Sequence, residues 1–333
     1  LKKAFVFIAV MLFSATVYAD TETAKQAVSE YIASVSSDEL TPGYANGEWF
    51  VLSAARSDTK LKDGYFDVYY KKLCDTLKQN GGVLSERKYT EYSRTVIALT
   101  AIGKDPRNVS GYDLLEKLAD IDAVKKQGVN GSIYALIALD CGNYIIPQAK
   151  SGTQATRALY IEHILSAQKS DGGFSLSGDK GDADMTAMAL QALAKYKDDK
   201  KINESIEKAL VWLSENQLDN GGYATVGEET CESSAQVLTA LCTLGIDPDT
   251  DERFIKNGQT IRIFFLPLEA LGVLYSYSLA IAITLSMVSF ENLWVLEFER
   301  IIETAAVEMP AFSAIVFNVI DFFIIIIVVK KSK

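Results

Sequence analysis

Histidine and proline are scarce in this chain of 333 residues, which contains one histidine, His163, and 6 prolines. A single imidazole cannot build the multi-histidine sites common among zinc proteins, so no metal site is expected. With only 21 glycines as well, the composition excludes a collagen-like or low-complexity chain. Basic residues number 33 against 43 acidic ones. Nucleic acid is therefore not an expected partner, because phosphate contacts require clustered lysine and arginine.

Apolar side chains are abundant. Hydrophobic residues make up 49% of the sequence and charged residues 23%, which excludes intrinsic disorder and suffices for a large core. The formal net charge of −10 resides within residues 20–260, which predicts a solvated acidic surface there. Two of the four cysteines, Cys231 and Cys242, stand on one expected helix, about 16 Å apart along its axis. That separation is too large for a disulfide between them.

Residues 1–19 have the pattern of a secretory signal peptide. A Leu-Lys-Lys start precedes an apolar run from Ala4 to Val17, and Val17 and Ala19 are the small residues that precede a cleavage site before Asp20. The alternative is an N-terminal membrane anchor that is not cleaved. Both interpretations predict that the chain from Asp20 onward is exported to the extracellular space or the cell surface.

Residues 261–333 form a hydrophobic C-terminal segment with one or two possible transmembrane helices. Residues 272–290 carry no charge, and residues 310–329 are apolar apart from Asp321 and precede a basic tail. A cytoplasmic basic tail and an exported domain together require an odd number of spans. Three alternatives stay open: only the last segment spans, the first packs on protein, or the segment is an artefact of the gene model. The expectation is a membrane-anchored surface protein.

The middle of the chain, residues 20–260, contains an internal repeat. Glycine-rich turns end at Gly82, Gly131, Gly173 and Gly222, at steps of 49, 42 and 49 residues. Each turn precedes a helical segment rich in small apolar residues, and amphipathic helical segments precede three of the turns. The expected inner helices are 47–56, 92–102, 132–140, 184–196 and 233–244, and the expected outer ones are 22–35, 67–79, 153–168 and 202–217. Such a repeat predicts an all-α chain of five stacked helical hairpins, with a sixth beginning at residues 251–256.

Two turns carry the pattern Gln-x-x-x-Gly-x-aromatic. Its members are Gln168, Gly172, Gly173 and Phe174 in the first copy, and Gln217, Gly221, Gly222 and Tyr223 in the second. The pattern resembles the repeat motif of the squalene cyclase and protein prenyltransferase superfamily, whose fold is an α/α toroid. The resemblance implies that glycine permits the tight turn, that the aromatic ring packs in the core, and that glutamine ties the outer helix to the turn.

One activity that the resemblance implies is that of a class II terpene cyclase, which protonates an alkene with an Asp-x-Asp-Asp motif. Asp182-Ala183-Asp184-Met185 resembles this motif with Met185 in place of the last aspartate. Asp184 would be the general acid and Asp182 its neighbour, since crowded carboxylates hold one another protonated. The alternative is that both aspartates cap and complement the N-terminus of a helix. The zinc site of the prenyltransferases is not expected.

The other activity is binding without catalysis, as in secreted cobalamin carriers that share the toroid. The candidate ligand-binding residues are Trp49, Tyr92, Tyr134, Glu232 and Gln236, and the last two lie on one helix face. The sequence therefore predicts an exported, non-catalytic toroid that binds a small hydrophobic or corrinoid-like molecule, or a surface partner. A cyclase that uses Asp184 is the alternative. A structural surface repeat without a small ligand is the third possibility.

Overall fold

The computed structural model describes residues 29–44, 46–57, 59–225, 227–261 and 264, and this part of the chain is helical, as predicted. Residues 29–34 are helical. The α-helices that follow are α3 Glu48–Arg56, α4 Asp67–Gln79, α5 Thr90–Ala101, α6 Ile121–Val124, α7 Gly128–Cys141, α8 Arg157–Ser166, α9 Ala183–Leu193, α10 Lys200–Glu215 and α11 Cys231–Leu244. Its 3-10 helices are η1 Ser37–Glu39, η2 Leu114–Leu118, η3 Lys125–Gln127, η4 Ala194–Tyr196 and η5 Glu252–Phe254. Two short strands, β1 Ala224–Thr225 and β2 Glu228–Glu229, pair antiparallel.

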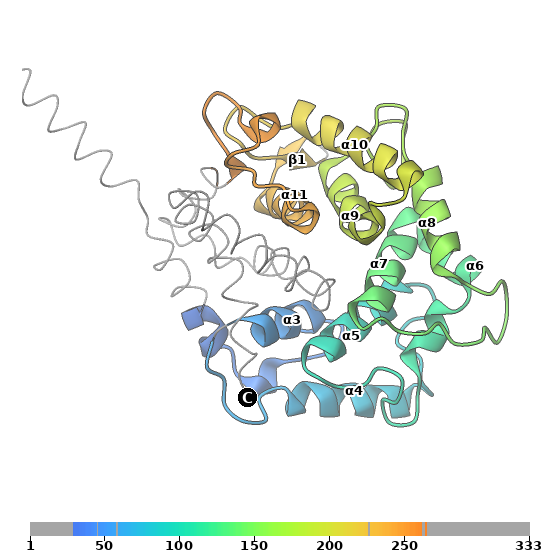
Figure 1. Ribbon diagram of the computed structural model, residues 1–333. Coiled ribbons are helices and arrows are strands. Elements are labelled where there is room, and N and C mark those ends of the chain that lie inside the picture. Colours follow the sequence, from blue (N-terminus) through green and yellow to red (C-terminus); the bar gives the residue numbers. More distant parts are fainter. Residues whose placement is uncertain (1–28, 45, 58, 226, 262–263, 265–333) are drawn as a thin grey trace, which may run out of the picture.

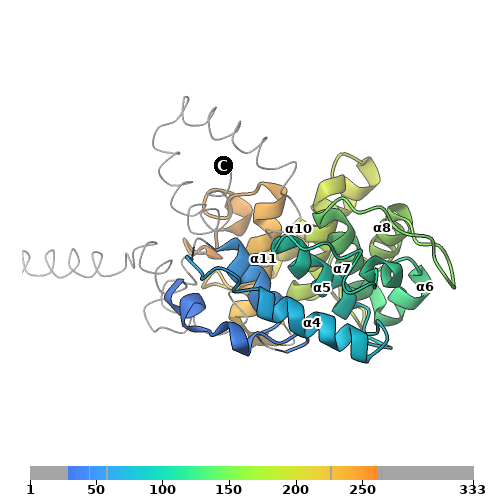
Figure 2. The same ribbon diagram turned by 90° about the horizontal axis from the view of Figure 1, so that it is seen from below.

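The helices α3, α5, α7, α9 and α11 form a curved row in which each packs against the next. Figure 1 shows this arc with α4, α8 and α10 outside it, and Figure 2, seen from below, again places α4 on the outer side. The predicted inner segments, and the predicted outer segments 67–79, 153–168 and 202–217, therefore occupy these two layers. The predicted outer segment 22–35 is described only from residue 29 onward.

Burial distinguishes the two layers. In α7, every residue except Gly128 and Asn130 is buried, which is the pattern of a helix surrounded by protein. In α4, by contrast, the buried residues are Tyr69, Leu73 and Leu77, which lie four apart on one face. The third outer position differs, because η2 and α6 stand there in place of a long amphipathic helix.

The two motif glutamines make the same pair of hydrogen bonds. Gln168 Nε2 donates to Gly172 O at 2.8 Å and to Ser205 O at 2.9 Å. Gln217 Nε2 donates to Gly221 O and to Phe254 O, both at 3.0 Å. One bond of each pair closes the turn, and the other reaches the next outer element, which is α10 or η5. The glutamine thus ties successive hairpins together as well as each helix to its own turn.

The remaining motif residues complete each turn. Gly172 has φ +94°, and a Cβ there would lie 2.8 Å from Lys208 O, so both conformation and space require glycine. The rings of Phe174 and Tyr223 are completely buried. Their backbone N–H groups donate to Thr186 Oγ1 and Ser234 Oγ, each at 2.9 Å. Each turn is therefore joined to the first part of the following inner helix.

Two sequence-predicted segments lie outside this description. The signal peptide of residues 1–19 is entirely outside the described residues, as is the segment 261–333 except for Ile261 and Phe264. Within the described ranges, no helix has the length and apolar character that crossing a membrane requires. The predicted C-terminal spans fall outside these ranges and stay predictions.

The glutamine contacts generate the first testable prediction. Replacing Gln217 by alanine leaves the buried carbonyls of Gly221 and Phe254 without this donor, which we expect to lower the free energy of unfolding by about 2–4 kcal/mol. Urea denaturation of the full chain, followed by circular dichroism, measures the change. Gln79 is exposed at the end of α4, and Gln79→Ala serves as the control with an effect below about 0.5 kcal/mol. Equal effects of the two substitutions would contradict the assigned role.

Candidate functional site

Aromatic side chains from two helices that are not neighbours meet on the inner side of the arc. The rings of Trp49 in α3 and Tyr134 in α7 lie with centroids 5.8 Å apart at an interplanar angle of 45°. Helix α5 stands between α3 and α7 in the row (Figure 1). On the concave side of a curved row, alternate helices come closer together, so their side chains can meet past the helix between them. This contact therefore marks the inner surface.

Helix α9 adds a thioether and a carboxylate to the same place. Tyr134 Oη lies 3.7 Å from Met188 Sδ. Asp184 is one turn before Met188 and shares its face of α9. Burial raises the pKa of Tyr134, the charge of Asp184 raises it further, and the charge of Arg94 on α5 lowers it. We call Trp49, Arg94, Tyr134, Asp184 and Met188 the inner cluster.

The two aspartates before α9 have different roles. Asp182 is the N-cap, because its carboxylate accepts from the Met185 N–H at 2.8 Å. Burial raises the pKa of Asp182, and the neighbouring charge of Asp184 adds to that effect. Asp184 Oδ1 is buried and accepts no hydrogen bond within the described part of the chain. Helix capping thus accounts for Asp182, whereas Asp184 retains an unpaired acceptor beside Tyr134.

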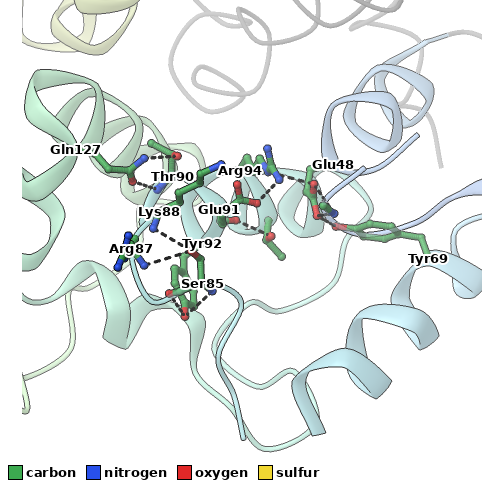
Figure 3. A network of polar contacts seen from close by, with 12 residues as sticks. Glu48, Tyr69, Ser85, Arg87, Lys88, Thr90, Glu91, Tyr92, Arg94 and Gln127 are labelled. Carbon is green, nitrogen blue, oxygen red and sulfur yellow. Dashed lines mark hydrogen bonds and ion pairs between the residues drawn. The ribbon is translucent and has the colours of Figure 1, made fainter. Parts of the chain in front are cut away.

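An ion pair between Glu48 and Arg94 joins α3 to α5 (Figure 3). Glu48, at the start of α3, is 3% exposed, and its Oε2 lies 3.2 Å from Arg94 Nε. Its Oε1 accepts from Tyr69 Oη at 3.2 Å, and Arg94 pairs also with Glu91. Burial raises the pKa of Glu48, while Arg94 opposes this shift. The guanidinium is therefore shared by two carboxylates and fixes α3 against α5.

Tyr92 lies in a different environment from the inner cluster. It is completely buried, and its Oη accepts from the backbone N–H groups of Leu84 and Ser85 (Figure 3). The register that aligns Gly103 with Gly245 also aligns Tyr92 with Ser234, whose hydroxyl binds the equivalent turn. The hydroxyl of Tyr92 thus binds the turn that follows Gln79-Asn80-Gly81-Gly82, a turn that has no aromatic residue at the motif position.

The two candidates on α11 continue the inner row. Gln236 Oε1 accepts from Gln191 Nε2 of α9 at 2.9 Å, and both amides are buried. Glu232 is the second residue of α11, as Asp184 is the second residue of α9. When the two helices are aligned by their N-caps, Asp182 and Thr230, Met188 of α9 corresponds to Gln236 of α11. The ligand-binding roles of these residues, and of Trp49 and Tyr134, stay predictions.

Sequence reasoning missed Arg94 and Met188 as inner-surface residues. The repeat register contained the information for Arg94, since the match of residues 95–103 with 237–245 aligns Arg94 with Gln236. The same position thus carries arginine in α5, methionine in α9 and glutamine in α11.

The single histidine serves the scaffold. His163 Nδ1 on α8 lies 2.7 Å from Ser132 Oγ on α7, and Ser132 is completely buried. A buried serine cannot meet a substrate, so this pair joins an inner to an outer helix. Within the described residues there is no cluster of His, Cys, Asp and Glu that could hold a metal ion, and the four cysteines there are free thiols.

Comparison with known proteins adds no neighbour. No protein-family model, no curated protein and no solved structure matches the chain. The assignment of function therefore depends on the residues and their geometry.

The Glu48–Arg94 pair generates a prediction for stability. In Arg94→Met, the buried Glu48 carboxylate loses this cation, which we expect to destabilise the chain by about 3–5 kcal/mol at pH 7. Because burial raises the folded-state pKa of Glu48, this loss should diminish as the pH falls through that pKa and the group takes up a proton. Urea denaturation at pH 7 and pH 5 measures both effects. The control is Arg107→Met, which breaks a largely exposed pair with Asp105 and should lower the stability far less than Arg94→Met does.

His163 generates a second prediction, for titration. Burial lowers its pKa from the usual 6.5, and the charge of Lys125 adds to this. As the pH falls, the unfolded chain therefore takes up the proton before the folded chain does. The stability that neutral His163 contributes is fully present above pH 6.5 and is lost as the pH falls through the folded-state pKa. As the chain has one histidine, a single imidazole resonance should report a pKa below 6.5 by NMR. A value above 6.5 would contradict the burial of the imidazole beside Lys125.

Proposed function

We propose that the arc belongs to an α/α toroid that binds a small, largely apolar molecule on its inner side and releases it unchanged. The observation that carries this proposal is the meeting of Trp49, Tyr134 and Met188 from three inner helices. Aromatic rings and a thioether offer large, polarisable contact surfaces to an apolar ligand. A corrinoid-like or polycyclic molecule fits this chemistry, and the resemblance of the glutamine motif to toroid proteins supports the fold.

The immediate surroundings of Asp184 favour binding over catalysis. A cyclase acid requires a neighbouring carboxyl group to keep it protonated. Asp182 is already engaged as the N-cap of α9, and Met185 stands where the third aspartate of the motif belongs. The proposal retains export and attachment to a membrane through residues 261–333, which rests on the sequence pattern of the two ends.

A cyclase remains the second candidate because of one observation. Asp184 Oδ1 is buried without a hydrogen-bond partner among the described residues, next to an aromatic pair of the kind that stabilises carbocations. In this alternative, the Asp184 carboxyl group would protonate an alkene, and Asp184→Asn would abolish product formation.

The experiment is native mass spectrometry of the full chain, purified in mild detergent and incubated separately with cobalamin and squalene. We expect a retained adduct with at least one of them, weakened about tenfold or more in Trp49→Leu, because truncating a central aromatic contact commonly has that effect. The matched control is Trp212→Leu, since Trp212 lies on the outer helix α10 and bonds Asp171. Loss of binding in both variants alike would indicate unfolding, which circular dichroism checks.

Cyclisation of squalene is an isomerisation and leaves the mass unchanged. The bound molecule must therefore be extracted and compared with squalene by gas chromatography. Recovery of unchanged ligand supports the binding function. A shifted product that disappears in Asp184→Asn supports the cyclase. Absence of any adduct from folded protein argues against both and favours a structural surface repeat.

A further inference from the structure

A second buried acceptor without a partner stands in the first turn of the neighbouring inner helix. Asn130 Oδ1 of α7, like Asp184 Oδ1 of α9, is buried and has no hydrogen-bond partner within the described residues. The two residues stand in the first turns of neighbouring inner helices, Asn130 third in α7 and Asp184 second in α9. Buried acceptors are normally paired, so two unpaired ones at the same end of adjacent helices call for a donor from outside the described chain.

The side-chain directions bring these acceptors to the inner cluster. Asn130 is one turn before Tyr134 on α7, and Asp184 is one turn before Met188 on α9, so each acceptor shares a helix face with a cluster residue. Tyr134 Oη and Met188 Sδ are in contact at 3.7 Å, which places the two faces against each other. Helical periodicity therefore puts both acceptors on the faces of α7 and α9 that meet at Tyr134 and Met188, and the charge of Asp184 acts on the Tyr134 hydroxyl.

The charges around the aromatic pair favour a cation over an anion. The inner cluster holds one carboxylate, Asp184, and one basic residue, Arg94, whose charge is offset by the carboxylates of Glu48 and Glu91 outside the cluster. Because Arg94 already pairs with Glu48 and Glu91, it is not available to bind a phosphate or carboxylate. The N-terminus of α9, which would otherwise attract an anion, is capped by Asp182 and carries Asp184 in its first turn.

We propose that the ligand is an organic ammonium compound, with its charged nitrogen at Asp184 and Asn130 and its apolar body against Trp49 and Tyr134. The ammonium group donates to the two unpaired oxygens, and the ring faces attract the positive charge. This inference rests on the proposed binding function and specifies its ligand class. It does not require that the ligand be a corrinoid or a polyprenyl compound.

The test uses three molecules that share one rigid hydrocarbon body: 1-adamantanamine, 1-adamantanol and 1-adamantanecarboxylate. The full chain, in phosphatidylcholine nanodiscs, is titrated with each by isothermal calorimetry at pH 7, and titrations of empty nanodiscs are subtracted. We expect the amine to bind at least tenfold more tightly than the alcohol and the carboxylate to bind most weakly, because one charge-assisted hydrogen bond is worth about that ratio.

Two asparagine variants locate the effect. Asp184→Asn keeps the shape of the side chain, removes its charge and should reduce amine affinity to that of the alcohol. Asp182→Asn is the matched control, since asparagine caps a helix as well as aspartate does, and it should leave the preference for the amine unchanged. A preference that survives Asp184→Asn, or a carboxylate that binds as tightly as the amine, overturns the inference.

The design separates failure of the inference from failure of the proposed function. In one outcome, all three molecules bind equally well, with binding lost in Trp49→Leu and retained in Asp184→Asn. That result would support an apolar binding site and overturn the specificity for an ammonium group. If none of the three binds, the ammonium inference is overturned, and the cobalamin and squalene experiment decides the binding function separately.

Discussion

The spacing of the hairpins depends on one side-chain amide. Both hydrogens of the Gln168 amide, and both of the Gln217 amide, are used between a glycine turn and the next outer element. An amide held at two carbonyls fixes the relative position of two consecutive hairpins more closely than apolar packing alone, because hydrogen bonds are directional. These two ties lie in the last hairpins of the described chain. The contact between Trp49 and Tyr134, which passes over α5, lies in the earlier part of the row.

Constant and variable positions of the repeat serve different purposes. A hydroxyl group near the start of an inner helix binds the preceding turn in α9 and α11, through Thr186 and Ser234. Tyr92 supplies that hydroxyl from a longer side chain in α5. The position that carries Arg94 and Met188, in contrast, changes its chemistry from one repeat to the next. The turn-binding hydroxyl thus recurs in α5, α9 and α11, whereas the group at the position of Arg94 and Met188 differs from helix to helix.

Local patterns in the sequence predicted the helices and the motif turns, because glycine spacing and apolar periodicity act within a few residues of each other. Trp49 was identified as an aromatic residue and Asp184 as part of a motif, and each prediction was independent of the other. Their common location arises from the curvature of the arc, which no local pattern encodes. The hydrogen bonds between the Tyr92 hydroxyl and its turn were not visible in the sequence either, and the predicted ligand-binding role of Tyr92 stays a prediction. The short third outer unit was likewise not visible, since residues 114–127 lack a long amphipathic run.

The electrostatics of the inner side limit which ligands suit it. A buried carboxylate such as Glu48 is tolerated because Arg94 lies 3.2 Å away, and that pairing occupies the guanidinium together with Glu91. The remaining carboxylate of this group, Asp184, therefore faces Tyr134 without a basic partner in the inner cluster. A ligand with a diphosphate would add negative charge beside a guanidinium that Glu48 and Glu91 already pair, and it would incur a large desolvation cost. A neutral hydrocarbon would enter but would leave the Asp184 acceptor unpaired. A cationic hydrogen-bond donor suits the site better than either, because it pairs the Asp184 acceptor and balances the negative charge.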